Sequence, residues 1–435
     1  MKGMIPRGVF ALGFLRLLGI LLAVALAPAR AADGELRVET GFEGASARVV
    51  SIDQATRSIG FEPGGDPRHG WPCWWSFRIR GAQAGETLTL RLRALSAPIP
   101  QSAYGWLKDK PLSLDWASPS RAAWSVDGET WQQTESGVRE GDWMSYRLKA
   151  TAEQVLVAWG PPYTASRSAE FVRGCAQKNP AVAKAESLCQ SRDGRPVPLL
   201  RMAEGGRPGS QRGTLWIQAR QHAWECGSSW IAQGVAEWIL AGCPEAAWLR
   251  QQYEIVVVPV MDVDHVASGQ GGKEALPQDQ NRDWSARPHW PEVAAAQVAL
   301  GALMDAGRLS AFIDLHNPGP GDRAVHFHTP PDEASKPGQR AAIERFEGLA
   351  KMHFTKVLPV QEKLVKSGAV YSPTWMQMSH CWVAARAPES TLALCIETPW
   401  NTDRSNQEGY REMGAAIGLT LSKFLQESGV ISPKP

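Results

Sequence analysis

The chain has 435 residues, of which 43% are hydrophobic and 21% are charged. This composition excludes a wholly disordered protein and suits two globular domains better than one. The formal net charge is only +2 and no long basic run occurs, so the sequence does not indicate a nucleic-acid partner. No pattern indicates an oligomeric state.

Residues 1–31 have the pattern of a signal peptide. Lys2 and Arg7 precede an apolar stretch from Leu15 to Leu26, and Ala29-Arg30-Ala31 offers a small-x-small cleavage site. The apolar stretch is short for a membrane span. We therefore expect export to the periplasm or the medium, with no membrane span left after cleavage.

The next part of the chain, from Leu36 to Trp159, is predicted to form short β-strands. Trp75–Ile79 and Leu88–Leu92 alternate apolar and polar residues, as half-buried strands do. Asp127-Gly128 is typical of a turn between two further strands. These signals predict a small antiparallel β-sandwich domain over residues 33–162.

After Pro161-Pro162-Tyr163, buried strands alternate with amphipathic helices. The predicted strands are Leu215–Ala219, Ile255–Val260, Leu309–Leu315 and Leu392–Ile396. The predicted helices are Ser228–Leu240, Pro291–Met304, Arg340–His353 and Gly409–Leu425. Ser228 is a suitable N-cap for the first helix. The alternation predicts an α/β domain over residues 163–430, with a mixed, largely parallel sheet flanked by helices.

The chain has seven cysteines. An oxidising compartment permits disulfides, and the odd number leaves at least one thiol unpaired. Cys175 and Cys189 flank a short polar loop and are the first pair to test. No spacing matches the paired C-x-x-C of a structural zinc site.

Polar residues follow each of the four predicted strands of the α/β domain. In chain order they are His222 with Glu225, then Asp279 with Asn281 and Arg282, then His316, then Glu397. Ligands gather beyond the carboxyl ends of strands in open α/β sheets, so these residues can converge. Two histidines and one glutamate form a catalytic zinc set that leaves one position for water. A further glutamate can accept the proton of that water.

Four stretches in this order resemble motifs of the zinc carboxypeptidases of the carboxypeptidase A superfamily. The resemblance is closest to the branch that includes the cytosolic carboxypeptidases and their bacterial relatives. The stretches are Ala219–Glu225, Asp279–Trp284, Asp314–His316 and Ile396–Pro399. That branch also carries an N-terminal β-sandwich, and Trp74–Arg78 and Pro161–Thr164 resemble its signature stretches.

The resemblance implies one zinc ion per chain, bound by His222, Glu225 and His316. Glu397 would be the general base and then the general acid. Asp279 would not bind the zinc itself. Its carboxylate would orient a ligand imidazole, expected to be that of His222.

The same resemblance implies the residues that bind the substrate. Asn281 and Arg282 would hold the terminal carboxylate of a peptide, a task that suits the planar fork of arginine. Lys273 is the one cation placed to polarise the scissile carbonyl, where many relatives have arginine. Tyr371 matches the family's mobile substrate-binding tyrosine.

Two side chains, Trp224 and Arg386, are expected to set the shape and the specificity of the predicted site. Trp224 stands where the family commonly has glycine, and its ring is expected to narrow the mouth of the site. Arg386 lies in the segment before Glu397 where relatives place the specificity pocket, which predicts a preference for an acidic C-terminal residue.

Two other groups of residues invite a functional interpretation. His326 and His328 point to one face of a predicted strand, but no third ligand lies near in sequence, so we favour a structural role. Tryptophans of the sandwich region could stack on sugar rings, although core packing is the safer interpretation. They are Trp71, Trp74, Trp75, Trp106 and Trp116.

The sequence therefore predicts a zinc-dependent metallocarboxypeptidase that removes the C-terminal residue of peptides or proteins. One alternative is an exported zinc amidase or deacylase that acts on peptidoglycan-derived peptides or acylated amino acids. A second alternative is a non-catalytic glycan- or peptide-binding protein with a degenerate hydrolase domain.

The first prediction concerns maturation. If residues 1–31 are a signal peptide, N-terminal sequencing of the exported protein should start near Ala32. Recovery of the protein from the cytoplasm with Met1 still in place would refute it.

Overall fold

The structure is a computed structural model that describes residues 34–102, 107–205, 212–317 and 319–427. The expected signal peptide, residues 1–31, and Trp106 lie outside the described residues.

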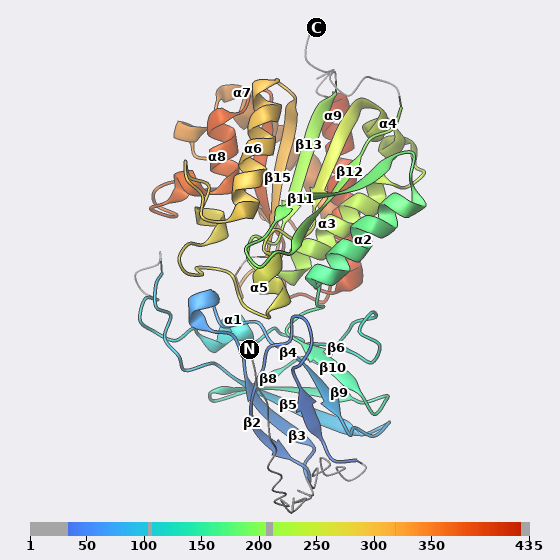
Figure 1. Cartoon of the computed structure of the whole chain (residues 1–435), viewed down its shortest axis with the longest axis vertical. Coiled ribbons are helices and arrows are strands. Elements are labelled where there is room, and N and C mark those ends of the chain that lie inside the picture. The colour runs from blue at the N-terminus through green and yellow to red at the C-terminus, as the bar shows by residue number, and fades with distance from the viewer. Residues whose placement is uncertain (1–33, 103–106, 206–211, 318, 428–435) are drawn as a thin grey trace, which may run out of the picture. The chain divides into compact units, whose positions relative to one another are not determined.

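Two five-stranded sheets form the N-terminal region (Figure 1). One has the order β1 (Arg37–Glu39), β4 (Ser76–Arg80), β10 (Val155–Ala158), β6 (Ala123–Ser125) and β7 (Gln132–Gln133). The other has the order β2 (Arg48–Asp53), β3 (Ser58–Glu62), β5 (Thr87–Arg93), β9 (Trp143–Lys149) and β8 (Val138–Glu140). The pairs are antiparallel apart from β3 and β5, which run parallel. The predicted sandwich is therefore confirmed, with one parallel pair that the sequence did not indicate.

The alternation of apolar and polar residues explains the core between these sheets. In β5, Leu88, Leu90 and Leu92 are fully buried while the residues between them face outward. The ring of Phe61 packs edge-on against Trp75 at 5.0 Å between centroids. Burial of such large rings provides much of the stability of a small β core.

An eight-stranded sheet forms the second region. Its order is β11 (Ala183–Gln190), β12 (Pro196–Met202), β14 (Tyr253–Val258), β13 (Gly213–Ala219), β15 (Leu309–His316), β18 (Leu392–Glu397), β16 (His326–Thr329) and β17 (Val365–Lys366). The four central strands β14, β13, β15 and β18 run parallel, so their carboxyl ends lie at one edge of the sheet. The other pairs are antiparallel, except β16 with β17.

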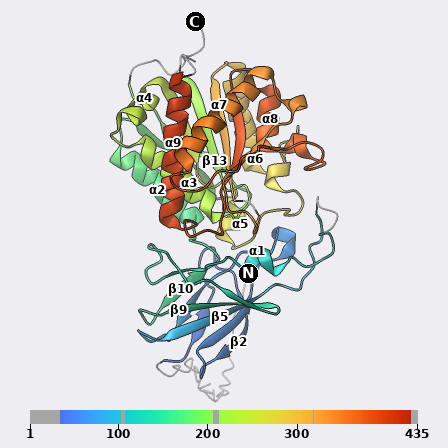
Figure 2. The same ribbon diagram turned by 180° about the vertical axis from the view of Figure 1, so that it is seen from behind.

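Helices cover both faces of this sheet. They are α2 (Ala165–Lys178), α3 (Cys226–Ile239), α4 (Pro244–Gln252), α5 (Val263–Ala267), α6 (Pro291–Asp305), α7 (Pro337–Phe354), α8 (Ser379–Arg386) and α9 (Gln407–Glu427), and the short α1 (Leu114–Ala117) lies in the N-terminal region. Helices α2 and α6 lie in front of the sheet in Figure 1, and α7 and α9 lie in front of it in Figure 2. Because both faces are covered, the central strands are continuous apolar runs rather than alternating ones.

The predicted mixed, largely parallel sheet with flanking helices is confirmed, and one detail of it is wrong. Helix α3 begins at Cys226 with Glu225 as its N-cap, not at Ser228. Ser228 lies in the first turn, where its hydroxyl donates to the carbonyl of Glu225 at 2.8 Å. The shift places a candidate metal ligand at the end of the helix.

All seven cysteines are free thiols in the structure, including Cys175 and Cys189. No helix in the described part of the chain is both long enough and apolar enough to cross a membrane.

Glycines allow α3 and α9 to pack backbone against backbone. A Cβ atom on Gly414 would lie 2.2 Å from the carbonyl oxygen of Ile231 and 2.6 Å from the backbone nitrogen of Val235. A Cβ atom on Gly234 would lie 2.2 Å from the carbonyl oxygen of Arg411. Since Glu225 is the N-cap of α3, this close crossing positions the candidate site as well as the core.

We expect Gly414→Ala to lower the free energy of unfolding by about 1–3 kcal/mol, because the added methyl group forces the two helices apart. Gly301→Ala is the matched control: it also lies within a helix, but its Cβ atom would meet no atom within 4 Å. It should leave stability unchanged or raise it by up to about 1 kcal/mol. Chemical denaturation of both variants decides this, and equal stability would show that the helix crossing tolerates a side chain.

Candidate active site

A tight turn after β13 carries two of the predicted zinc ligands. Arg220 starts it with a φ of 67°, a left-handed conformation that a non-glycine residue adopts only when its surroundings hold it there. Its buried guanidinium provides that support, since Nε donates to the carbonyl of Ala223 at 2.7 Å and Nη1 to the hydroxyl of Ser229 at 3.1 Å. The turn therefore presents His222 and Glu225 to the edge of the sheet from a fixed base.

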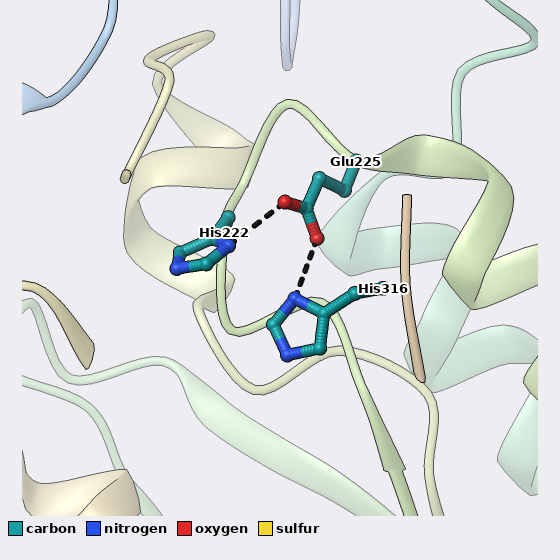
Figure 3. A group of neighbouring side chains, drawn as sticks. All are labelled: His222, Glu225 and His316. Carbon is teal, nitrogen blue, oxygen red and sulfur yellow. Dashed lines mark hydrogen bonds and ion pairs between the residues drawn. The ribbon is translucent and has the colours of Figure 1, made fainter. Parts of the chain in front are cut away.

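The carboxylate of Glu225 lies between two imidazoles (Figure 3). Its Oε1 is 2.8 Å from Nδ1 of His222, and its Oε2 is 2.8 Å from Nδ1 of His316, the last residue of β15. One ligand atom from each of the three side chains lies within 4.8 Å of the others. All three residues are buried, with at most 2% of their surface exposed.

A second carboxylate faces the far nitrogen of each imidazole. Asp279 Oδ1 lies 3.2 Å from Nε2 of His222, as expected for the residue that orients this ring. Asp314 Oδ2 lies 3.0 Å from Nε2 of His316. If each Nε2 carries the proton and donates it outward, each Nδ1 keeps a lone pair for a metal.

The role of Asp314 was missed in the sequence, although a signal was present. Asp314 and His316 are two residues apart on one strand, so their side chains share a face. Asp314 also accepts hydrogen bonds from Gln221 and Ser379. These two donors fix the carboxylate that orients the ring of His316.

The charges of this cluster suit a bound cation. Burial alone would raise the pKa of Glu225, but the two facing imidazoles outweigh it and hold this pKa well below its usual range. The pKa of Asp279 is lowered in the same way by His222, against the effect of burial. Three buried carboxylates around two imidazoles leave an excess of negative charge, which a divalent cation would offset. The donor set of two nitrogens and one carboxylate is one that zinc prefers.

Glu397 differs from Glu225 in its surroundings. It ends β18 directly beside His316 in the parallel register, and its Oε2 has no hydrogen-bond partner among the described residues. Desolvation, together with the negative charge of Glu225, raises the pKa of this carboxyl group. A carboxylate with a raised pKa next to the ligand set can take up a proton more readily than the ligand carboxylate can.

Both carboxylates line one cavity of about 340 Å³, a size within the usual range for small-ligand sites. Lys273 and Tyr371 line the same cavity. The ammonium group of Lys273 lies 5.3 Å from the ring centroid of Trp71.

The sandwich supplies part of the cavity wall. Trp71 comes from one of its loops and Trp116 from the short helix α1, and Trp224 from the turn before α3 joins them in lining the cavity. The rings of Trp116 and Trp224 pack edge-on at 6.0 Å between centroids. The ring of Trp224 is thus one part of an aromatic wall of the cavity. Trp71 and Trp116 also belong to this wall, so they do not serve the sandwich core alone.

Two residues predicted to bind the substrate, Asn281 and Arg282, do not line this cavity in the part of the chain that is described. Asn281 and Arg282 are buried, and the amide nitrogen of Asn281 lies 3.3 Å from Nε2 of His316. Arg282 donates through Nε to Ser372 and through Nη1 to the carbonyl of Asn281. Neither is among the described residues that line the cavity, and their role in holding a substrate carboxylate stays a prediction.

Arg386 does not support the expected preference for an acidic residue. It is exposed at the end of α8, where its guanidinium stacks on the ring of Trp382 at 4.5 Å and donates to the carbonyl of that residue. It is not among the described residues that line the cavity. The interpretation of Arg386 as part of a specificity pocket therefore stays a prediction.

We expect Asp314→Asn to weaken zinc binding about 10- to 100-fold, because an amide of the same size orients the ring of His316 without a negative charge. Asp322→Asn is the control, since Asp322 lines the cavity without a hydrogen bond to either histidine. Competition with a chelator measures both affinities. An Asp314→Asn protein that binds zinc as tightly as the parent would show that this carboxylate does not support the ligand.

Comparison with known sequences gives a consistent result. The pattern of the zinc carboxypeptidase family matches residues 169–317. An uncharacterized protein of Zymomonas mobilis is 27% identical over 295 residues, which cover 67% of this chain and 68% of that protein. Cytosolic carboxypeptidase 2 of Danio rerio is 26% identical over 263 residues, which cover 56% of this chain but only 35% of that protein.

Solved structures share the fold. A metallo-carboxypeptidase from Burkholderia cenocepacia has a TM-score of 0.72 at 21% identity, covering 91% of this chain and 100% of that one. A metallo-carboxypeptidase from Pseudomonas aeruginosa, in complex with (2-guanidinoethylmercapto)succinic acid, has a TM-score of 0.70 at 22% identity and covers 90% and 99% of the two chains. This chain thus matches the zinc carboxypeptidase family over residues 169–317, is distantly similar to the cytosolic carboxypeptidases, and shares the fold of bacterial metallo-carboxypeptidases.

Proposed function

We propose that the chain is a zinc-dependent metallocarboxypeptidase that removes the C-terminal residue of peptides or proteins. The observation that carries this proposal is the pair of glutamates on one cavity. Glu225 belongs to the ligand set, and Glu397 stands beside it with one carboxylate oxygen that no described residue hydrogen-bonds. Carboxylates in such different environments suit different tasks, one as ligand and one as base.

Zinc held by His222, Glu225 and His316 would supply Lewis-acid chemistry, lowering the pKa of a water molecule and polarising a carbonyl group. Glu397 would take the proton of the attacking water on its carboxylate. It would then return that proton to the nitrogen of the leaving amino acid, because the amine must be protonated to leave. The rigid strand end that carries Glu397 would keep its carboxylate in place for both transfers.

The remaining residues of the cavity would bind and orient the peptide. Lys273 would place its positive charge near the carbonyl oxygen as negative charge develops there. Tyr371, which lines the same cavity, would also contact the substrate. The aromatic wall of Trp71, Trp116 and Trp224 would exclude water from one side of the scissile bond.

A second candidate function is supported by one observation. Arg282, the residue expected to select a free terminal carboxylate, is only 5% exposed and is not among the described residues that line the cavity. A zinc amidase or deacylase that acts on peptidoglycan-derived peptides or acylated amino acids would not need this selection. The two functions differ in whether the substrate must end in a carboxylate.

We also propose that the protein acts in the periplasm or is secreted. The support for this is the sequence of residues 1–31 alone.

A peptide with a free C-terminus and the same peptide with an amidated C-terminus separate the two candidates. A carboxypeptidase should cleave the free peptide at least about 100-fold faster, because the amide leaves a buried charged partner unpaired. Similar rates on both peptides would favour the amidase, and no cleavage of either by the zinc-loaded chain would contradict both.

Glu397→Gln and His316→Ala, measured in the same assay, separate chemistry from metal binding. Glu397→Gln should keep its zinc and lose about 10²–10⁴-fold in turnover, because the amide cannot accept the proton. His316→Ala should lose much of the zinc as well, since two ligands hold the ion poorly. Near-normal turnover of Glu397→Gln would overturn the mechanism.

A further inference from the structure

Two imidazoles that the proposed mechanism does not use lie on the wall of the same cavity. His326 and His328 share one face of β16, with 5.3 Å between their ring centroids, and both line the cavity. In the antiparallel register with β18, His326 stands opposite Glu397. The structural role favoured for this pair in the sequence leaves their position beside the reaction centre unexplained.

His328 is fixed in place and electrically neutral. Its Nδ1 lies 3.2 Å from the hydroxyl of Ser367, and its ring packs edge-on against Tyr371 at 4.8 Å between centroids. Burial, helped by the nearby positive charges of other histidines and Arg282, holds the pKa of His328 well below its usual range. A neutral imidazole offers one donor and one acceptor, and only one of its nitrogens is engaged by a described residue.

His326 makes no hydrogen bond through either ring nitrogen to another described residue. Its Nδ1 is buried without a partner, although only 7% of the residue is exposed. Leaving a buried polar atom unpaired costs free energy, so such atoms normally have a partner that completes them. At a cavity wall, the available partner is whatever occupies the cavity.

We propose that His326 and His328 form a hydrogen-bonding wall that recognises the side chain of the residue to be released. This wall favours a side chain that ends in a carboxamide or carboxylate over an apolar side chain of the same size. The shared chemistry is an oxygen that accepts a hydrogen bond from an imidazole N–H. The inference rests on the proposed carboxypeptidase function, since it assigns the specificity of that same site.

The expected selectivity has its physical basis in the free-energy cost of placing an apolar side chain against the two imidazoles. An apolar side chain would cover the imidazole nitrogens and leave them unpaired, whereas a carboxamide would pair with them. A site with such groups therefore rejects an apolar analogue more strongly than a plain apolar pocket rejects a polar one. Trp71, Trp116 and Trp224 line the cavity with apolar rings, so the selective polar contacts are concentrated on the imidazole pair and its neighbours.

Three peptides that differ only in their C-terminal residue test this. Glutamine and methionine are similar in size and uncharged, so their ratio of kcat/KM reports hydrogen bonding, and glutamate reports the added effect of charge. The parent protein should favour glutamine over methionine about tenfold or more. A preference for methionine would overturn the proposal.

Matched substitutions assign the preference to the two histidines. His326→Leu and His328→Leu remove both ring nitrogens, whereas His326→Asn and His328→Asn have the same size as the leucine variants and keep a donor and an acceptor. The leucine variants should lose most of the glutamine preference and cleave the methionine peptide at near-parental rates, and the asparagine variants should keep part of the preference. His353→Leu, on α7 away from the cavity, is the control. Equal losses with both peptides, or asparagine variants no better than leucine variants, would contradict the proposal.

A binding measurement keeps this test independent of turnover. Calorimetry compares zinc-loaded Glu397→Gln protein with the double variant that also carries His326→Leu. The added His326→Leu substitution should weaken binding of the glutamine peptide about tenfold or more and change binding of the methionine peptide little. If this holds while the parent protein releases no C-terminal residue, the proposed function fails and the binding role of the histidines stands. If the parent releases residues but neither ratio changes in the variants, the inference fails and the proposed function stands.

Discussion

The carboxylate of Glu225, shared between the imidazoles of His222 and His316, is the contact around which the α/β domain is organised. Glu225 can occupy this place because it caps α3, and α3 is held by its glycine-mediated crossing with α9. His316 reaches it from the end of a central parallel strand. The left-handed turn at Arg220 brings the remaining ligand back over the sheet edge. The packing of α3 on α9, the register of β15 and the turn at Arg220 together place both imidazoles against the two carboxylate oxygens of Glu225.

The electrostatic environments of Glu225 and Glu397 differ, and this difference suits the two glutamates to different roles. Glu225 faces two imidazoles, which keep it ionised despite burial and suit it to hold a cation. No described residue hydrogen-bonds Oε2 of Glu397, and desolvation with the charge of Glu225 raises the pKa of Glu397, which suits it to exchange a proton. Two carboxylates on neighbouring elements acquire opposite tendencies because of what surrounds them, a pattern typical of acid–base sites.

Much of this arrangement follows from the sequence, because buried parallel strands are easily seen and their carboxyl ends must meet. The four central strands and the polar residues after them were predicted on that basis, and His222, Glu225 and His316 do lie together. Other features depend on tertiary contacts that no local pattern encodes. The start of α3 at Cys226 is set by the cluster that Glu225 joins, and the cavity position of His326 and His328 depends on the pairing of β16 with β18. Trp71 reaches the cavity from a loop of the sandwich region and Trp116 from the short helix α1, and periodicity does not predict the paths of such connecting segments.

The central claim is that one zinc ion is held by two imidazoles and one carboxylate beside the cavity that Glu225 and Glu397 line. X-ray absorption at the zinc edge of the purified, active chain tests it directly. The account predicts one zinc per chain with only nitrogen and oxygen neighbours, at distances of about 2.0–2.2 Å, and two of them with the scattering pattern of imidazole. A sulfur neighbour at about 2.3 Å, which would indicate a cysteine ligand, or full activity in a chain free of zinc would contradict it.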